Sequence, residues 1–314
     1  MTTMLKLGSR GSKLALTQSR TVAAAVEALG AASVELEVIK TTGDAIQDRP
    51  LPEIGGKGLF TQELDSALLE GRIQFAVHSL KDLPTDMDPR LCVTATAKRV
   101  DPRDVIVGPA GSRTTLVGLA EGAILGTSSL RRAALARAFR PDLEVRDIRG
   151  NVDTRLAKVD AGDYDAVILA GAGLLRLGLE ERIGEWMERT SWLPAPAQGA
   201  LGIVTRTDDD ETRALLEPLR HRETEMAVAA ERALLAALGG GCHVPVGALG
   251  LTYADGLRLW AMVASPDGRQ LVRADLTGSA HDPAELGRRT AQTLIDRGAN
   301  ALLEAAEADG ALGP

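Results

Sequence analysis

One structural unit occurs twice along this chain, and this repeat constrains the fold more than any other feature. Each copy runs through a strand, a Gly-Ser/Thr turn, a helix, a strand, a Gly-rich loop, a helix and a further strand. The first copy spans residues 5–77 and the second spans residues 123–169. Strands that alternate with helices predict a parallel sheet covered by helices, so the repeat predicts two α/β lobes. We expect the lobes to face each other across a cleft into which helix N-termini point.

The turns of the two copies show where the helices begin. Ser12 is the expected N-cap of a helix over 13–29, and the turn Gly126-Thr127-Ser128-Ser129 precedes a helix over 130–139. The remaining helices predicted in the two copies lie over 59–70 and 152–161. The predicted strands lie over 5–7, 34–39, 75–77, 123–125, 143–148 and 164–169, and a loop is predicted over 170–173. The alternative is that any two βαβ units would look this similar, because element order and turn chemistry carry the comparison rather than residue identity.

A third region begins near Arg220 and has a different order of elements. A helix over 223–238 is followed by three strands, at 246–251, 257–264 and 271–277, joined by Asp-Gly turns that predict antiparallel hairpins. A last helix begins at Asp282, with a proline at its first position and an acid in its first turn. The predicted domains are lobe 1, residues 1–97 with 198–218; lobe 2, residues 98–197; and a C-terminal domain, residues 219–314.

Composition excludes several classes of function. Aromatic residues make up 3% of the 314 residues, too few for platforms on which single-stranded nucleic acid stacks. A net charge of −7 disfavours a general binder of nucleic acid or anionic membranes, and no apolar run is long enough to span a bilayer. The N-terminus lacks the regions of a signal peptide, so we expect a cytoplasmic protein. Four histidines and two cysteines show no metal-ligand spacing, and we expect no metal site.

The stretch from His78 to Pro84 is the first candidate for chemistry. It follows the apolar run Phe75-Ala76-Val77, and α/β proteins place active sites beyond the carboxyl ends of their strands. The stretch offers the carboxylate of Asp82, the amine of Lys81 and the hydroxyl of Ser79. A carboxylate at such a position can stabilise a positive charge or move a proton. The alternative is a solvated turn closed by a proline.

Basic residues collect at the turns of this acidic protein. They are Arg10, Lys57, Lys81, Arg131, Arg132, Arg149 and Arg155. Arginine binds carboxylates through two parallel hydrogen bonds, and helix N-termini with hydroxyl side chains add further donors. The sequence contains no P-loop, so a ligand with several carboxylates is a better fit than a nucleotide. The alternative, for some of these arginines, is pairing with acids of the core.

The two cysteines lie in different surroundings. Cys242 follows three glycines, and a thiol on such a loop can be exposed enough to carry a covalent group. Cys92 lies between Leu91 and Val93 in an apolar strand, and we expect it to be a buried core residue.

Together these stretches resemble the porphobilinogen deaminase family, whose members are also called hydroxymethylbilane synthases. The motifs that carry the resemblance are 8-GSRGS-12, 55-GGKGLF-60, 78-HSLKDLP-84, 126-GTSSLRR-132, 149-RGNV-152, 198-QGA-200 and 240-GGC-242. The resemblance covers essentially the whole chain. It implies an α/β fold with two lobes like type II periplasmic binding proteins and a smaller α+β C-terminal domain with a three-stranded antiparallel sheet.

The resemblance also implies an activity and a cofactor. A dipyrromethane cofactor would be attached to Cys242 by a thioether. Four molecules of porphobilinogen would be joined head to tail onto it with loss of ammonia, and water would release hydroxymethylbilane for haem and other tetrapyrroles. The implied protein is a cytoplasmic monomer whose partner is this small substrate, with no nucleic acid and no membrane. The rival from another class is a non-catalytic two-lobed module that binds an anion.

The resemblance assigns roles residue by residue, with Asp82 as the catalytic residue. Implied cofactor-binding residues are Cys242, Ser79, Lys81, Asp82, Thr127, Ser128, Ser129, Arg131, Arg132, Arg149, Gly150 and Ala170. Implied substrate-binding residues are Arg10, Ser12, Lys57, Phe60, Arg149, Arg155, Arg176 and Gln198. The sequence departs from the family in two places. Glu53 stands where some members have a lysine, and Arg99-Val100-Asp101 replaces a frequent Arg-Glu-Asp.

Overall fold

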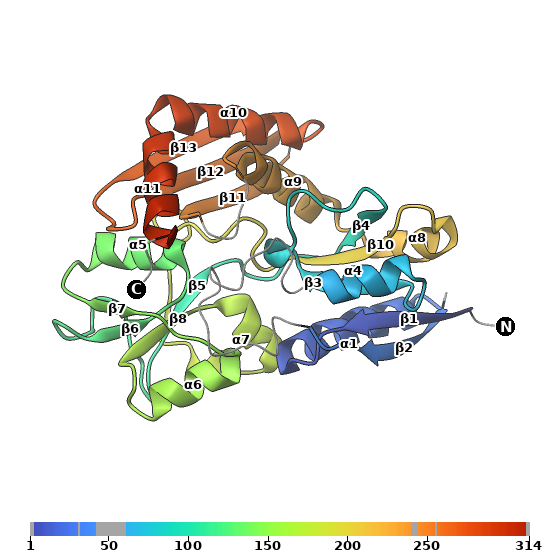
Figure 1. Ribbon diagram of the computed structural model, residues 1–314, viewed down its shortest axis with the longest axis horizontal. Coiled ribbons are helices and arrows are strands. Elements are labelled where there is room, and N and C mark those ends of the chain that lie inside the picture. The colour runs from blue at the N-terminus through green and yellow to red at the C-terminus, as the bar shows by residue number, and fades with distance from the viewer. Residues whose placement is uncertain (1–2, 31, 42–60, 240–243, 255, 312–314) are drawn as a thin grey trace. The chain divides into compact units, whose positions relative to one another are not determined.

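The computed structural model describes residues 3–30, 32–41, 61–239, 244–254 and 256–311 (Figure 1). The chain divides into two compact units. Unit 1 comprises residues 1–100 with 200–225, and unit 2 comprises residues 101–199 with 226–314. The described part of the chain includes no helix long and apolar enough to cross a membrane.

Unit 1 is built on a five-stranded sheet of order β2-β1-β3-β10-β4. Strands β1 to β3 are parallel, and β10 runs antiparallel between β3 and β4. The strands are β1 (Thr3–Ser9), β2 (Ala32–Val38), β3 (Phe75–Ser79), β4 (Leu91–Thr96) and β10 (Leu201–Arg206). The helices are α1 (Lys13–Ala28), α4 (Gln62–Leu69) and α8 (Asp210–Leu216), with 3₁₀ turns η1 (Leu80–Asp82) and η3 (Glu217–Leu219).

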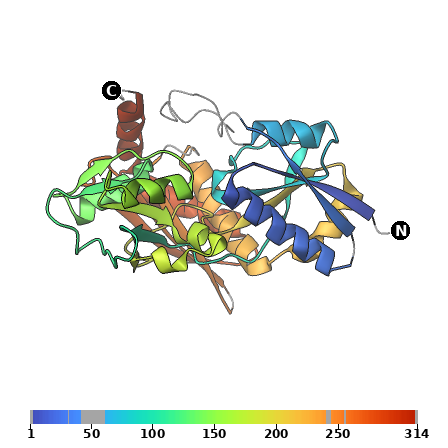
Figure 2. The ribbon, with the colours of Figure 1, turned by 90° about the horizontal axis from the view of Figure 1, so that it is seen from below.

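Alternation along β1 explains how two helices cover opposite faces of this sheet (Figure 2). Leu5 and Leu7 point to one face and pack in one core cluster with Val22 of α1. Gly8 points to the other face, where a Cβ atom would lie 2.9 Å from the side chain of Leu64 on α4. The glycine therefore lets α4 approach the strand that leads into the turn at Arg10.

Unit 2 contains a second five-stranded sheet of order β7-β6-β8-β5-β9, with the same sequence of parallel and antiparallel neighbours. The predicted repeat of two α/β lobes is therefore confirmed. Its strands are β5 (Asp104–Val107), β6 (Ile124–Gly126), β7 (Glu144–Arg146), β8 (Ala166–Ala170) and β9 (Glu185–Trp186). Its helices are α5 (Leu130–Phe139), α6 (Val152–Asp160) and α7 (Gly171–Leu177), with the 3₁₀ turn η2 (Glu180–Arg182).

The predicted loop over 170–173 is wrong, because α7 begins at Gly171. Gly171 and Gly173 are buried, and a Cβ atom on Gly171 would collide with the ring of Trp186. Close packing against Trp186, rather than chain reversal, requires glycine at position 171.

The C-terminal part of unit 2 is a three-stranded antiparallel sheet covered by helices, as predicted. The strands are β11 (Val246–Tyr253), β12 (Gly256–Ala264) and β13 (Leu271–Gly278), and the helices are α9 (Arg222–Ala237), α10 (Pro283–Asp296) and α11 (Ala299–Ala311). The sequence predicted one helix after Asp282, but the structure has two, α10 and α11. They are separated at Gly298, whose φ of +93° ends the first helix.

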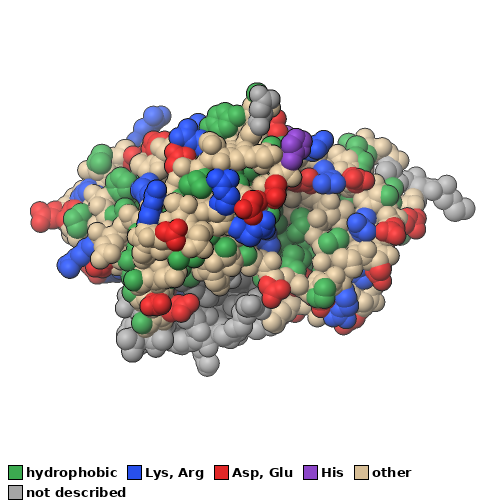
Figure 3. Space-filling view, turned by 90° about the horizontal axis from the view of Figure 1, so that it is seen from above, with side chains coloured by type: hydrophobic (Ala, Val, Ile, Leu, Met, Phe, Trp, Pro, Cys, Tyr) green, Lys and Arg blue, Asp and Glu red, His purple; other side chains and the backbone are tan. Residues whose placement is uncertain are grey.

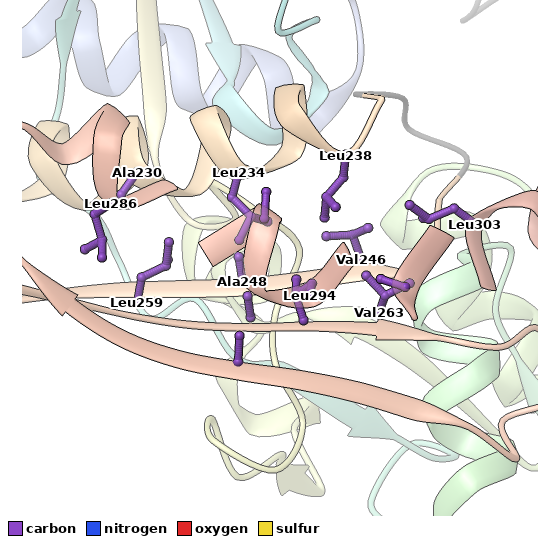
Figure 4. Close-up of a cluster of buried hydrophobic side chains, with 14 of the residues drawn as sticks. Ala230, Leu234, Leu238, Val246, Ala248, Leu259, Val263, Leu286, Leu294 and Leu303 are labelled. Atoms are coloured by element: carbon purple, nitrogen blue, oxygen red, sulfur yellow. The ribbon is translucent and has the colours of Figure 1, made fainter. Parts of the chain in front are cut away.

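The two faces of this sheet belong to two different cores. On one face, Leu234 of α9 and Leu294 of α10 pack against Ala248 and Val263 (Figure 4). On the other face, Leu249 and Met262 join a cluster with residues of the second α/β lobe, including Leu135 of α5. The C-terminal sheet and the second lobe therefore share a hydrophobic core.

Candidate functional site

The turn that carries Asp82 is fixed by its neighbours while its carboxylate is exposed. Leu80 and Leu83 on either side are buried, at 1% and 3% exposure. The N–H of Leu80 donates to the carbonyl of Ala200 (3.0 Å), and the N–H of Leu83 donates to the carbonyl of Leu80 (3.3 Å). Gly202 beneath the turn leaves room for Leu80, whose side chain would lie 2.7 Å from a Cβ atom there. A rigid backbone thus presents one carboxylate beyond the end of β3.

The other unit 1 candidates lie at the same edge of the sheet. Arg10 and Ser12 follow β1, while Ser79 ends the neighbouring parallel strand β3 and Lys81 and Asp82 come directly after it, so both groups lie at carboxyl strand ends. Ser12 is the N-cap of α1, as predicted, and its hydroxyl accepts from the N–H of Ala15. Ser79 is the last residue of β3, and Lys81 and Asp82 lie in the 3₁₀ turn η1 that follows it.

Gln18 is a polar residue at this edge that sequence reasoning missed. It is buried, and its Nε2 donates to Oγ of Ser79 (2.9 Å). Its position is four residues before Val22 and eight before Val26, both buried on α1, so it lies on the apolar face of that helix. A glutamine on the core-facing side of a predicted helix is the signal that could have indicated it.

In unit 2 the centre of the candidate site is Asp104, another residue that sequence reasoning missed. Its carboxylate is fully buried and accepts from Arg131 Nη1 (2.7 Å), Arg132 Nη2 (2.8 Å), Gln198 Nε2 (2.8 Å) and Trp192 Nε1 (3.0 Å). Burial acts to raise its pKa, but the two guanidinium groups outweigh this and hold the pKa of Asp104 well below its usual value. Two of the three arginines predicted to bind the cofactor, Arg131 and Arg132, are therefore partly engaged by a core acid. No local pattern indicates this pairing, because Asp104 lies 27 residues before Arg131.

The predicted hydroxyl donors next to these arginines build the turn before α5. Ser129 caps the helix by accepting from the N–H of Arg132, and Thr127 Oγ1 accepts from the N–H of Ser129 (3.2 Å). Ser128 Oγ donates to the carbonyl of Ile148. These contacts fix the helix start that holds the arginines in place.

Arg155 belongs to a cluster of positive charge that follows the end of β7. Its Nε donates to the carbonyl of Gly150 (2.8 Å), whose φ of +109° requires glycine. Burial, with the nearby cations Arg132 and Arg149, lowers the pKa of Arg155 to about 10, while Asp147 opposes the change. Arg155 still carries its charge at neutral pH.

Arg176 on α7 is another half-buried arginine of unit 2. Its Nη2 donates to the carbonyl of Gly199 (2.7 Å), and burial lowers its pKa to about 10. Within the described ranges, neither Arg155 nor Arg176 forms an ion pair with a carboxylate. Burying an unpaired charge is costly, so these two positions favour an anionic ligand.

Several exposed arginines, unlike Arg155 and Arg176, pair with carboxylates of other described residues. On the face shown in Figure 3, basic and acidic side chains are interspersed among the described residues. Arg258 and Asp275, for example, form an exposed pair at 2.6 Å, as do Arg72 and Glu70 at 2.8 Å. Such pairs account for charge on a solvated surface and require no ligand.

Several predictions fall outside the described residues or need correction. Cys242, Lys57, Phe60 and the departure at Glu53 lie outside the described residues. Cys92 is not buried as expected: it is half-buried, and its sulfur contacts the hydroxyls of Thr94 (3.5 Å) and Thr205 (3.8 Å). No group of three or more potential metal ligands occurs among the residues that the structure covers.

Unit 1 thus brings together Arg10, Ser12, Ser79, Lys81 and Asp82 at one sheet edge. Unit 2 brings Arg131, Arg132 and Gln198 together around Asp104, with Arg149, Gly150 and Arg155 beside them. Arg176 reaches the same group through the backbone next to Gln198. Ala170 is the residue before α7, at the end of β8.

Comparison with known proteins gives a consistent result. A family model described as "Porphobilinogen deaminase, dipyromethane cofactor binding domain" matches residues 5–214, and one described as "Porphobilinogen deaminase, C-terminal domain" matches residues 226–296. A porphobilinogen deaminase of Roseiflexus castenholzii is 50% identical over 304 residues, which are 96% of this chain and 99% of the relative. One from Acidothermus cellulolyticus is 49% identical over 311 residues, covering 98% of this chain and 93% of the relative.

The solved structures that the comparison matched share little sequence with this chain. A putative methionine-binding lipoprotein from Bacillus subtilis has a TM-score of 0.42 and 10% identity, over 71% of this chain and 92% of the other. The family models and the near full-length relatives decide the assignment: this chain belongs to the porphobilinogen deaminase family.

Proposed function

We propose that this chain is a transferase that joins four porphobilinogen molecules head to tail, with loss of ammonia, and releases hydroxymethylbilane. Each porphobilinogen carries two carboxylates, so the growing product is a row of anions. The observation that carries the proposal is the pair of half-buried arginines, Arg155 and Arg176, that no described carboxylate neutralises. The curated relatives bear the name porphobilinogen deaminase, which favours an enzyme over a non-catalytic anion-binding module.

The described residues fit a dipyrromethane cofactor, which is itself a polycarboxylate. Arg131, Arg132 and Arg149 would hold its carboxylates, because guanidinium groups bind carboxylates through paired hydrogen bonds. Asp104 neutralises one positive charge of this group and leaves the rest for a ligand. When bound, the cofactor supplies the pyrrole carbon onto which substrate is added. We propose Cys242 as its point of attachment.

Asp82 is the proposed catalytic residue. Loss of ammonia from porphobilinogen leaves positive charge on the methylene and pyrrole of the substrate. A carboxylate on a fixed turn stabilises that charge without reorganisation, and it accepts a hydrogen bond from the pyrrole N–H. It can also take up the proton that leaves when the new carbon–carbon bond has formed. Arg10, Ser12, Lys57, Phe60, Arg149, Arg155, Arg176 and Gln198 are the proposed substrate-binding residues.

The remaining assignments extend this proposal. Ser79, Lys81, Thr127, Ser128, Ser129, Gly150 and Ala170 are proposed to contact the cofactor. We propose three domains, at 1–97 with 198–218, 98–197, and 219–314, in a cytoplasmic monomer that binds neither nucleic acid nor membrane. The domain proposal is supported by the two similar sheets and the separate antiparallel sheet.

Substitution of Asp82 tests the catalytic role. Asp82→Asn keeps the size of the side chain but removes its charge, so turnover of porphobilinogen should fall by about 100-fold or more. The mass of the covalent cofactor should remain on the protein. Asp86→Asn, an exposed residue four positions along the same loop, is the matched control and should keep turnover within about threefold. Near-native turnover of the Asp82→Asn protein would contradict the assignment.

A further inference from the structure

A buried carboxylate on α9 binds two backbone N–H groups that lie far apart in sequence. Glu231 has 0% exposure. Its Oε2 accepts from the N–H of Ala197 (2.5 Å) and its Oε1 accepts from the N–H of Gly250 on β11 (2.7 Å). Hydrogen bonds to an ionised carboxylate are stronger than neutral ones, and burial strengthens them further. Glu231 therefore ties the segment at Ala197 to the C-terminal sheet.

The helix that carries Glu231 is itself held closely. A Cβ atom on Gly250 would lie 2.8 Å from the carbonyl oxygen of Ala227, one turn before Glu231. Gly287 of α10 approaches the carbonyl of Ala230 closely in the same way. Because both contacts require glycine, α9 is fixed between β11 and α10, and Glu231 is a rigid anchor.

Ala197 has an unusual backbone conformation. Its φ is +63°, and among the described residues it is the one non-glycine with a positive φ. A left-handed conformation disfavours a residue with a Cβ atom, so neighbouring contacts must maintain it. The hydrogen bond from its N–H to Glu231 is such a contact.

The two residues after Ala197 contact the proposed ligand-binding arginines. Gln198 donates to Asp104 (2.8 Å) and its Oε1 accepts from Arg132 Nη2 (3.4 Å). The carbonyl of Gly199 accepts from Arg176 Nη2 (2.7 Å). The backbone conformation of residues 197–199 therefore determines the positions of the oxygen atoms that accept hydrogen bonds from Arg132 and Arg176.

We infer that Glu231 is a positioning residue: by holding Ala197 in its left-handed conformation, it places Gln198 and Gly199 so that Arg132 is oriented for the carboxylates of the cofactor and Arg176 for those of the substrate. This inference rests on the proposed function. Glu231 acts through the segment 197–199 and needs no contact with substrate.

Glu231→Gln tests the inference, because the amide replaces one of the two acceptor oxygens with a donor. The KM for porphobilinogen should rise about tenfold, the effect of losing a charge-assisted hydrogen bond, with kcat within about threefold. Adding Ala197→Gly should recover most of the KM, since glycine adopts the left-handed conformation without help. Leu294→Ala is the control: it removes a fully buried side chain from the C-terminal core, so it should lower the melting temperature and leave KM unchanged.

Arg176→Gln separates failure of this inference from failure of the proposed function. If Arg176→Gln raises KM but Glu231→Gln does not, Glu231 is only structural and the inference is wrong. If neither variant changes KM, the assignment of Arg176 to substrate is wrong as well. Should the Glu231→Gln protein not fold, Glu231→Asp keeps the charge but reaches only one of the two N–H groups. It should give a smaller rise in KM that Ala197→Gly again reverses, and an unchanged KM would overturn the inference.

Discussion

Buried charge at single residues distinguishes the proposed ligand-binding arginines from those of the surface. Asp104 accepts hydrogen bonds from two guanidinium groups, an amide and an indole, and all four donors are buried. One carboxylate cannot neutralise Arg131, Arg132 and the adjacent Arg155 together. The excess positive charge is what a ligand rich in carboxylates would complete, and Asp104 determines how the first two arginines are oriented.

Asp104→Asn should therefore destabilise the protein strongly. The substitution leaves two buried guanidinium groups without their shared anion, and breaking a buried pair costs about 3–5 kcal/mol of unfolding free energy. Urea unfolding followed by tryptophan fluorescence measures this, and Trp192, which donates to Asp104, should report the change. Asp160→Asn is the control, because its pair with Arg182 is partly exposed and should contribute about 1 kcal/mol or less. A loss for Asp104→Asn no larger than that of the control would contradict the role assigned to Asp104.

At the level of elements, the position of β3 inside its sheet buries His78 and so affects the pKa of its imidazole. Strand β3 lies between β1 and β10, and His78 is buried on it at 6% exposure. Its Nε2 has no hydrogen-bond partner among the described residues. Burial, with the nearby positive charge of Arg10, lowers the pKa of His78 from 6.5 to about 4. The folded protein therefore keeps this imidazole neutral at pH values where the unfolded chain protonates it.

This difference predicts acid sensitivity with a defined direction. Above pH 6.5 the imidazole is neutral in both states, and its contribution to stability is fully present. As the pH falls from 6.5 to about 4, only the unfolded chain gains the proton, and about 3 kcal/mol of unfolding free energy is lost. The difference between the urea midpoints measured at pH 7.5 and at pH 4.5 should therefore be smaller for the His78→Leu protein than for the native protein. The exposed His281→Leu control should keep the native difference, and an unchanged difference in His78→Leu would contradict the shifted pKa.

Local sequence predicted much of the order of elements and little of the long-range pairing. Ser12 and Ser129 cap the helices that their spacing predicts, because capping depends on neighbouring residues. The glycines at 171 and 173 were misread as a loop, since the ring that packs over Gly171 lies 15 residues further along the chain. Asp104 and Glu231 could not be predicted as anchors, because their partners are distant in sequence and are brought together by the fold.

At the scale of the whole molecule, two units with equivalent sheets each place polar residues beyond their strand ends. Unit 1 contributes a fixed carboxylate, Asp82, and unit 2 contributes half-buried arginines. The C-terminal sheet shares a core with the second lobe, and Glu231 links that sheet to the segment leading back into unit 1. The proposed function assigns the carboxylate to catalysis, the arginines to binding of carboxylates, and Cys242 to attachment of the cofactor.

The intact mass of the protein tests this central claim most directly. After incubation with porphobilinogen, the native protein should exceed the mass of its chain by at least two condensed pyrrole units. Cys92→Ser should show the same excess and remain active, whereas Cys242→Ser should show none and be inactive. A native protein that stays at the mass of the bare chain after this incubation, or a Cys242→Ser protein that carries the same excess, would contradict the account.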